Sequence, residues 1–175
     1  MYAASGRSKE AVEALKEASR LEPRRNNYRI VLATELLKLG DKDSLGDAKV
    51  QLDQVISTYE RDNVPAAIRD YRAWALRGDL LMSEGKYPFA QKDFVAALEL
   101  APGRVDLLFK TGLSLLEQSR HDDAVVYFKQ VLNKEPKHAG ANYYSGVIAV
   151  RNGQLGEAQR FMETASERDP EGYPE

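Results

Sequence analysis

Residues of the same kind recur along this chain at a constant step of 34 positions. Small, aromatic and proline positions all keep this step. The matching columns are Gly78, Gly112 and Gly146; Leu81, Leu115 and Ala149; Ala90, Ala124 and Ala158; Phe94, Phe128 and Met162; Ala97, Val131 and Ala165; and Pro102, Pro136 and Pro170. Because the chain holds only 12 glycines and 7 prolines, so many matched columns do not align by chance. A repeat of this length predicts a stack of small units that bury their apolar faces against their neighbours.

Each repeat has the pattern of two helices. Apolar residues follow three-and-four spacing, as in Val125, Phe128 and Val131, which is typical of a helix with one buried face. A glycine inside a helix costs about 1 kcal/mol relative to alanine, so the column of Gly78 indicates helices packed too closely to admit a side chain. The aromatic column then fills the space between hairpins, and prolines such as Pro102 stop the second helix. We predict an all-α fold of antiparallel helical hairpins stacked into an α-α superhelix.

These residues together resemble the tetratricopeptide repeat (TPR). The family signature is matched by Trp74, Gly78, Leu81, Gly85, Tyr87, Ala90, Phe94, Ala97 and Pro102. The resemblance is strong over residues 71–170 and weaker before them. The second half of a repeat is also matched near the start, by Gly6, Ala11, Leu15, Ala18 and Pro23. The resemblance implies a TPR solenoid, a fold that commonly binds other polypeptides.

We expect a single array over residues 1–175. Its predicted parts are a truncated repeat at 1–25, a repeat with an inserted turn at 26–62, further repeats at 63–104, 105–138 and 139–170, and a tail at 171–175. The first three helices are expected near 8–21, 27–39 and 44–60, and the last near 154–168. Ser119 stands where the other turns have glycine, so we expect it in a left-handed conformation.

The joint between the second and third repeats departs from the pattern. Three extra residues between Gly40 and Ala48 predict a longer turn between the two helices. The second helix lacks its stop proline, so we expect it to run a turn longer and to break at 61–63. Pro65 suits the first turn of a helix, which we expect to extend over about 65–84.

Composition excludes several classes of site. The net charge of -2 gives no global field for nucleic acid or anionic membrane. The absence of cysteine excludes disulfides and thiolate metal sites. No apolar run approaches the roughly 18 residues that cross a bilayer, so we expect no direct membrane insertion. The compartment stays open between cytoplasm and periplasm, with the chain as part of a longer one.

No motif for catalysis or cofactor binding stands out. His121, Asp122 and Asp123 form the one candidate metal cluster, but acidic residues that open a helix and complement its dipole explain it better. His138 lies at another turn. The sequence has no glycine-rich phosphate loop, paired-histidine motif or nucleophile elbow. We therefore expect no enzyme activity, no metal and no cofactor.

The resemblance also implies a binding surface, because first helices of the family line a concave face. Carried over residue by residue, the predicted contacts are Ile30, Thr34, Leu37, Arg72, Asp79, Met82, Phe109, Leu113, Leu116, Tyr143, Val147 and Val150. An apolar floor with a charged rim suits an amphipathic helix or an extended apolar segment. Phe109 and Tyr143 are the favoured anchors. The alternative is that these side chains only pack against their own or a neighbouring hairpin.

The predicted function is a non-catalytic protein-protein interaction scaffold. Family members that bind chaperone tails use lysine and asparagine where this chain has Phe109, Leu113 and Tyr143, so that role is not expected. The style of the repeats favours a bacterial-type assembly for the envelope, secretion or polysaccharide export. Two alternatives are a regulatory segment of a larger enzyme and a structural spacer. Both ends of the array look open, so we expect flanking repeats, a covering chain or self-association there.

Overall fold

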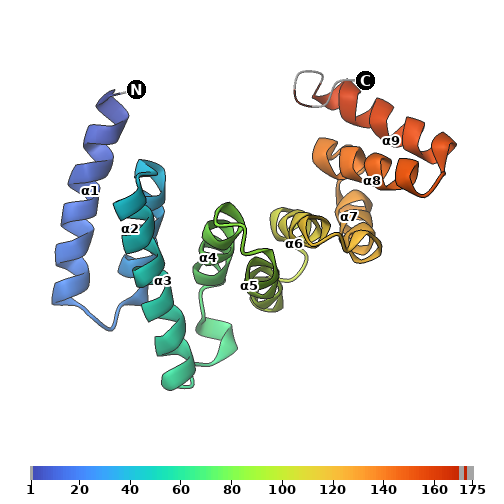
Figure 1. The fold of residues 1–175 in the computed structure, drawn as a ribbon. Helices are drawn as coiled ribbons and strands as arrows, with labels where there is room; N and C mark the ends of the chain where they lie inside the picture. Colours follow the sequence, from blue (N-terminus) through green and yellow to red (C-terminus); the bar gives the residue numbers. More distant parts are fainter. Residues whose placement is uncertain (1, 170–171, 173–175) are drawn as a thin grey trace. The chain divides into compact units, whose positions relative to one another are not determined.

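The computed structural model describes residues 2–169 and 172, and the side chains from residue 8 to residue 169. Throughout this part of the chain the regular structure is helical, which confirms the predicted all-α class (Figure 1). Contacts divide the chain into two compact units, Met1–Ala101 and Pro102–Glu175, called here the N-terminal and C-terminal units. Each is described by itself, and the single continuous array stays a prediction.

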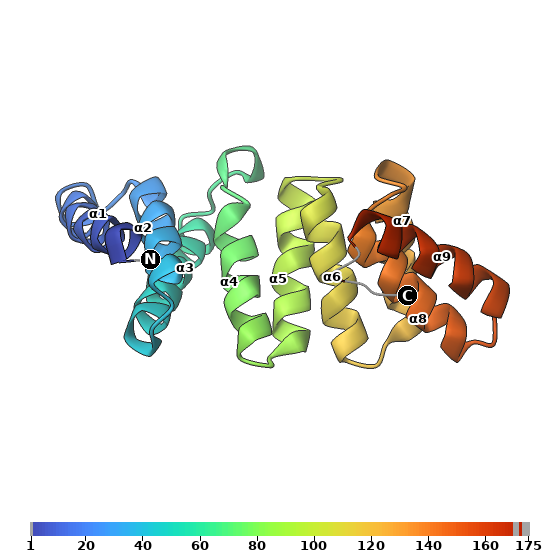
Figure 2. The same cartoon turned by 90° about the horizontal axis from the view of Figure 1, so that it is seen from above.

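The N-terminal unit contains two hairpins and one further helix. Its elements are α1 (Tyr2–Leu21), α2 (Asn26–Leu39), α3 (Lys42–Arg61), the 3₁₀ turn η1 (Ala66–Ile68), α4 (Arg72–Ser83) and α5 (Tyr87–Leu100). Helices α2 and α3 form one hairpin and α4 and α5 the next, while α1 packs against α2. Both views show α4 and α5 side by side (Figures 1 and 2).

The C-terminal unit contains two hairpins. They are formed by α6 (Val105–Glu117) with α7 (His121–Lys134), and by α8 (Ala139–Arg151) with α9 (Leu155–Arg168). Helix α7 also packs against α8, which joins the hairpins. Ser119, in the first turn, has φ 60° and so adopts the left-handed conformation that the sequence predicts. The proposed stop at Pro170 and the tail at 171–175 lie outside the described residues, apart from Gly172.

Close packing inside each hairpin explains the glycine column. A Cβ atom added to Gly78 would lie 2.5 Å from the ring of Phe94, and one added to Gly112 would lie 2.5 Å from Phe128. Both rings are fully buried. The prediction that these glycines admit no side chain is therefore confirmed. The prediction that the aromatic column fills the space between hairpins holds only in part: Phe94 and Phe128 each pack on the glycine of their own hairpin, and Phe128 also stacks on Tyr144 of the following one.

Two predicted boundaries in the first helices are wrong. Helix α1 begins at Tyr2, well before the predicted start at residue 8, so Gly6 lies inside the helix. The three inserted residues after Gly40 do not lengthen the turn. They extend α3 at its start, because Asp41 caps that helix by accepting a 2.9 Å hydrogen bond from the Ser44 backbone N–H. Helix α3 also runs further at its end, as predicted, so that it has 20 residues against 14 in α5.

The predicted helix over 65–84 is also wrong. A single 3₁₀ turn follows Pro65, Arg69 is extended, and α4 begins only at Arg72. Side chains stabilise this interruption: the Asp70 carboxylate accepts from the Arg72 backbone N–H at 3.0 Å, and the Tyr59 hydroxyl accepts from the Asp70 N–H at 3.3 Å. The predicted break after Arg61 is confirmed, since α3 ends there.

Candidate functional site

The predicted contact residues of the N-terminal unit lie on α2 and α4, which contact each other. Ile30 is wrong as a contact residue, because its side chain is 0% exposed and belongs to the core. Leu37 and Met82 are half-buried. Near the middle of this face stand two polar side chains: Thr34, whose hydroxyl donates to the Ile30 carbonyl at 2.9 Å, and half-buried Asp79.

Arg72 is the charged member of this predicted set. Its guanidinium donates to the Asp70 carboxylate at 2.6 Å and to the Asn27 side-chain carbonyl at 3.2 Å. Although burial raises the pKa of Asp70, hydrogen bonds from Arg72 lower it more, so the pKa lies below its ordinary value. Arg72 is thus engaged within its own unit, and the first-helix face of this unit is mixed in polarity.

The first-helix residues of the C-terminal unit form two matching apolar stripes. Helix α6 carries Phe109, Leu113 and Leu116, and α8 carries Tyr143, Val147 and Val150 one repeat later, each at helical i, i+4, i+7 spacing. Val147 is 39% exposed and Val150 47% exposed, whereas the other four are half-buried. The solvent-accessible part of the stripes therefore lies on α8.

An aromatic cluster holds α6 beside α8. The ring of Phe109 lies 4.7 Å from His138 and 6.1 Å from Tyr144 between centroids, and 5.8 Å from Phe128 of its own hairpin. Tyr143 meets Tyr144 edge to face at 5.3 Å. Contacts of this kind stabilise by about 0.5–1.5 kcal/mol each beyond their buried area. Phe109 consequently packs against its own hairpin and the next one.

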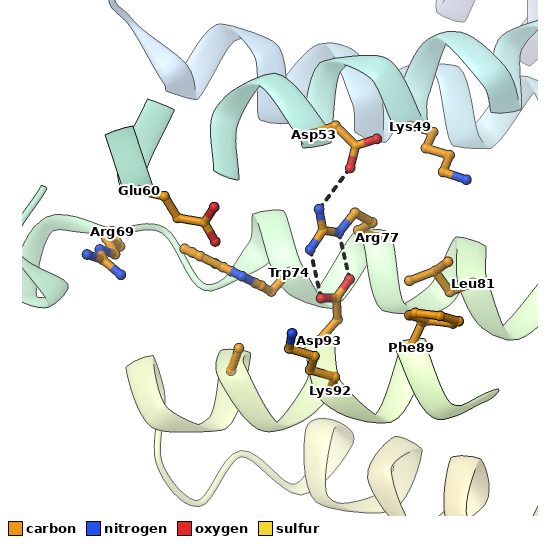
Figure 3. Close-up of a pocket in the computed structure, with 11 residues that line it drawn as sticks. Lys49, Asp53, Glu60, Arg69, Trp74, Arg77, Leu81, Phe89, Lys92 and Asp93 are labelled. Atoms are coloured by element: carbon orange, nitrogen blue, oxygen red, sulfur yellow. Dashed lines mark hydrogen bonds and ion pairs between the residues drawn. The ribbon is translucent and has the colours of Figure 1, made fainter. Parts of the chain in front are cut away.

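Sequence reasoning missed a pocket of about 450 Å³ in the N-terminal unit, between α3, α4 and α5 (Figure 3). Arg77 on α4 crosses it. Its guanidinium donates to both carboxylate oxygens of Asp93 on α5, at 2.7 and 2.8 Å, and to Asp53 on α3 at 2.8 Å. Asp93 is 4% exposed. The pKa of Arg77 is raised, chiefly by its hydrogen bonds to Asp93 and then to Asp53, against the opposing effect of burial.

A column of the repeat could have revealed this ion triad. Arg77 stands where the next two repeats have Thr111 and Ser145, so a charged residue replaces a small polar one at a buried position. Charges are buried only with partners, and the partners lie 24 and 16 residues away in sequence. The same pocket is lined by Trp74, which stacks on Tyr59 at 5.6 Å between ring centroids.

His138 has a structural role at the start of a helix. His138 Nδ1 accepts a 3.1 Å hydrogen bond from the Ala141 backbone N–H and caps the start of α8. Asp122 and Asp123 lie in the first turn of α7, as predicted. Within residues 8–169 no group of three or more His, Asp or Glu side chains is arranged to hold a metal ion. None of the described helices has the length and apolarity of a membrane span.

Models of the tetratricopeptide repeat match residues 75–130 and 115–175, which together cover more than half of the chain. The chain belongs to the tetratricopeptide repeat family. Among curated TPR proteins, it is similar to the tetratricopeptide repeat and J domain-containing co-chaperone DNJ1 of Cryptococcus neoformans, with 28% identity over 95 residues. That match covers 52% of this chain and 18% of the co-chaperone, so the chain spans only a small part of its relative's length.

Solved TPR structures share the fold. A crystal structure of MamA aligns with a TM-score of 0.80 at 18% identity, over 95% of this chain and 91% of that one. A fragment of MamA from Desulfovibrio magneticus RS-1 aligns at 0.77 and 20% identity, over 93% and 86%. YrrB, described as a TPR protein with an unusual peptide-binding site, aligns at 0.75 and 17% identity, over 97% and 81%. Arrays of this family are protein-protein interaction scaffolds and are typically non-catalytic.

Proposed function

We propose that this TPR chain is a non-catalytic scaffold whose C-terminal unit binds an apolar peptide or helix on the first helices α6 and α8. The observation that carries the proposal is the pair of matching stripes on these helices, with Val147 and Val150 exposed on α8. An exposed apolar row at helical spacing is the surface on which an amphipathic segment lays its own apolar side chains. Burying an exposed valine contributes about 1 kcal/mol.

Charged residues at the ends of the stripes restrict which peptides or helices can bind there. Asp106 lies near the start of α6, Glu117 at its end, and Arg151 at the end of α8. A partner with one apolar face and charges of both signs at its edges matches this surface. The ring of Phe109 packs against Tyr144 of α8, and it forms the floor of the proposed face with the half-buried side chains of Tyr143, Leu113 and Leu116.

In the N-terminal unit, Thr34, Leu37, Arg72, Asp79 and Met82 stay candidates for contact. We propose that this surface, which is mixed in polarity, also contacts a partner. Ile30 has no part in this surface. The two alternative roles, a regulatory segment of a larger enzyme and a structural spacer, predict no loss of partner binding when the α8 valines are replaced.

We also propose the kind of complex in which this scaffold takes part. A bacterial-type complex for the envelope, secretion or polysaccharide export follows only from the style of the repeats, and the MamA fragment of Desulfovibrio magneticus shares no more than the fold. Self-association through the ends of the array also stays a prediction. Light scattering of the purified chain tests it, and a monomeric mass at high concentration counts against it.

The similarity to DNJ1 favours a second candidate function. The name of that relative describes a co-chaperone, and an exposed apolar row also suits the transient holding of an unfolded polypeptide. We propose this as the alternative to a specific partner. A chain that slows aggregation of reduced, unfolded lysozyme, and loses that effect in Val147→Glu/Val150→Glu, supports it. No effect on aggregation rejects it.

Site-specific crosslinking tests the leading proposal. Peptides are first selected from a random phage-displayed library on the whole chain, and a photoreactive benzoylphenylalanine is then introduced in place of Val150. The matched control carries the same group in place of Val126, an exposed valine on the second helix α7. Crosslinking from position 150 alone supports the proposed face. Crosslinking from position 126 alone, or equal crosslinking from both, contradicts it.

A further inference from the structure

The pocket crossed by Arg77 has features that the packing of the hairpins does not require. Phe89, in the first turn of α5, lines it and is 65% exposed. The next two repeats have Asp123 and Glu157 at this position, where a carboxylate favours the helix N-terminus by about 0.3–1 kcal/mol. The first turn of α5 contains no acidic residue. With Phe89 at this position, α5 lacks the favourable interaction of a carboxylate with its N-terminus, and an aromatic ring is exposed to solvent.

Two of the three acidic side chains that line the pocket, Asp93 and Asp53, are engaged by Arg77. Asp93 uses both carboxylate oxygens and Asp53 uses Oδ1. Two lysines also line the pocket. Lys92 has no ion pair within the described residues, and Lys49 meets Glu84 only at 3.5 Å. Because Arg77 engages Asp53 and Asp93, these carboxylates compete less for the lysines, which keep the capacity to bind an anionic group.

The labelled side chains have a definite order in the pocket (Figure 3). Arg77 lies at the centre, between Asp53 and Asp93. Leu81 and Phe89 lie together on one side of it, and Trp74 lies on the other. An apolar contact patch therefore stands within the same pocket as the two lysines.

We propose that this pocket is a second docking site, which takes a short acidic peptide segment with a central pair of bulky apolar side chains. The apolar pair packs on Phe89 and Leu81, while flanking carboxylates pair with Lys49 and Lys92. The second oxygen of Asp53, which does not bond to Arg77, accepts from a peptide N–H. The site lies on α3, α4 and α5 of the N-terminal unit, whereas the proposed partner face lies on α6 and α8.

Local charges favour a peptide over a nucleic acid. Glu60 also lines the pocket, and Asp53 is 48% exposed at its side chain. A continuous row of phosphates would be repelled by both carboxylates, whereas a peptide separates its charges and supplies backbone donors. An exposed aromatic residue beside cations is also a common anchor in peptide recognition.

The equivalent groove of the C-terminal unit has a different character. It lies between α7, α8 and α9, and its charged lining residues are Asp122, Lys129 and Glu157. Ser145 stands there in place of Arg77. With two acidic residues and one basic residue, this groove does not attract an acidic peptide. Its residues therefore supply matched control variants.

Trp74 is a built-in reporter, because it lines the pocket and is the only tryptophan of the chain. The probe is the tryptophan-free peptide acetyl-Asp-Glu-Leu-Phe-Glu-Asp-amide, titrated into the whole chain while Trp74 emission is recorded. Calorimetry of the same pair gives a second readout. We expect saturable binding that weakens as salt is added. Replacing the four acidic residues of the probe with lysine, or its Leu-Phe pair with Ser-Gly, should weaken binding about tenfold or more.

Variants of the chain test whether the probe binds in this pocket. Phe89→Ala and Lys92→Glu should each weaken the probe about tenfold. The controls Val126→Ala and Lys129→Glu, on α7, should leave binding unchanged. So should Val147→Glu/Val150→Glu, which distinguishes failure of this site from failure of the proposed partner face. Absence of saturable binding by both readouts overturns the proposal. Equal binding of the lysine probe, equal effects of the controls, or tighter binding of oligothymidylate overturns it as well.

Discussion

Arg77 and Asp93 form a bidentate ion pair between α4 and α5, with N–O distances of 2.7 and 2.8 Å. Asp93 is almost fully buried, and the exposed fraction of the Arg77 side chain is 22%. A third bond from Arg77 to Asp53 joins this hairpin to α3. Arg77 therefore links the two hairpins of the N-terminal unit and lies in the pocket between α3, α4 and α5.

Replacing Arg77 should destabilise the chain more than any exposed charge does. Arg77→Met leaves Asp93 buried without a partner, so we expect the free energy of unfolding to fall by about 3 kcal/mol. Arg77→Met combined with Asp93→Leu should recover most of the loss, because no charge stays buried. Urea unfolding measures the difference. Asp53→Asn is the control and should cost less than about 1 kcal/mol, since Asp53 is half-exposed.

Two glycines should respond to alanine with opposite signs. Gly112→Ala places a methyl group against Phe128 and should destabilise by about 1–3 kcal/mol despite its better helix propensity. Gly46→Ala, inside α3, meets nothing within 4 Å and should stabilise by about 0.5–1 kcal/mol. Thermal unfolding of both variants tests the packing argument. Stabilisation by Gly112→Ala would show that the hairpin is looser than described.

Asp70 should make stability depend on pH in the acid range. Its pKa is lowered in the folded state, because hydrogen bonds from Arg72 outweigh the effect of burial. A lowered folded pKa contributes stability above the unfolded pKa of about 3.9, and that contribution is lost as the pH falls through the folded pKa. The stability difference between the wild-type chain and Asp70→Asn should thus be present at pH 7 and shrink below about pH 4. A constant difference across this range would argue against the ionised carboxylate as its cause.

Alanine substitution should destabilise the chain at the packed Phe109 but not at the exposed Val150. Phe109→Ala removes a ring that contacts Phe128, His138 and Tyr144, so we expect a loss of about 3 kcal/mol or more in urea unfolding. Val150→Ala should change the unfolding free energy by less than about 0.5 kcal/mol, because the side chain is exposed. Equal losses would mean that Val150 is packed as tightly as Phe109.

Periodicity predicts most of this fold, and local side-chain bonds account for the places where it fails. The column of Gly78 gives the close packing of each hairpin because that packing depends on one position that repeats. The start of α3 depends on one cap by Asp41, and the interruption before α4 depends on hydrogen bonds that the Asp70 carboxylate and the Tyr59 hydroxyl accept. Such bonds have no period, so a repeat alignment cannot reveal them.

The candidate sites, too, could be predicted from the sequence only in part. Family positions lead to the stripes of the C-terminal unit but also to Ile30, whose exposure depends on neighbours that the sequence pattern does not specify. The pocket around Arg77 was missed because its lining comes from three helices. A charged residue in an otherwise small polar column was the available signal, together with an exposed Phe89 in place of an acid.

The affinity of a library-selected peptide for Val147→Glu/Val150→Glu tests the central claim most directly. Calorimetry should show binding to the wild-type chain and to the matched control Val126→Glu with equal affinity. The double variant on α8 should bind at least about tenfold more weakly, while circular dichroism shows all three proteins equally folded. Unchanged affinity of the double variant would contradict the claim that this TPR chain holds its partner on the first helices of the C-terminal unit.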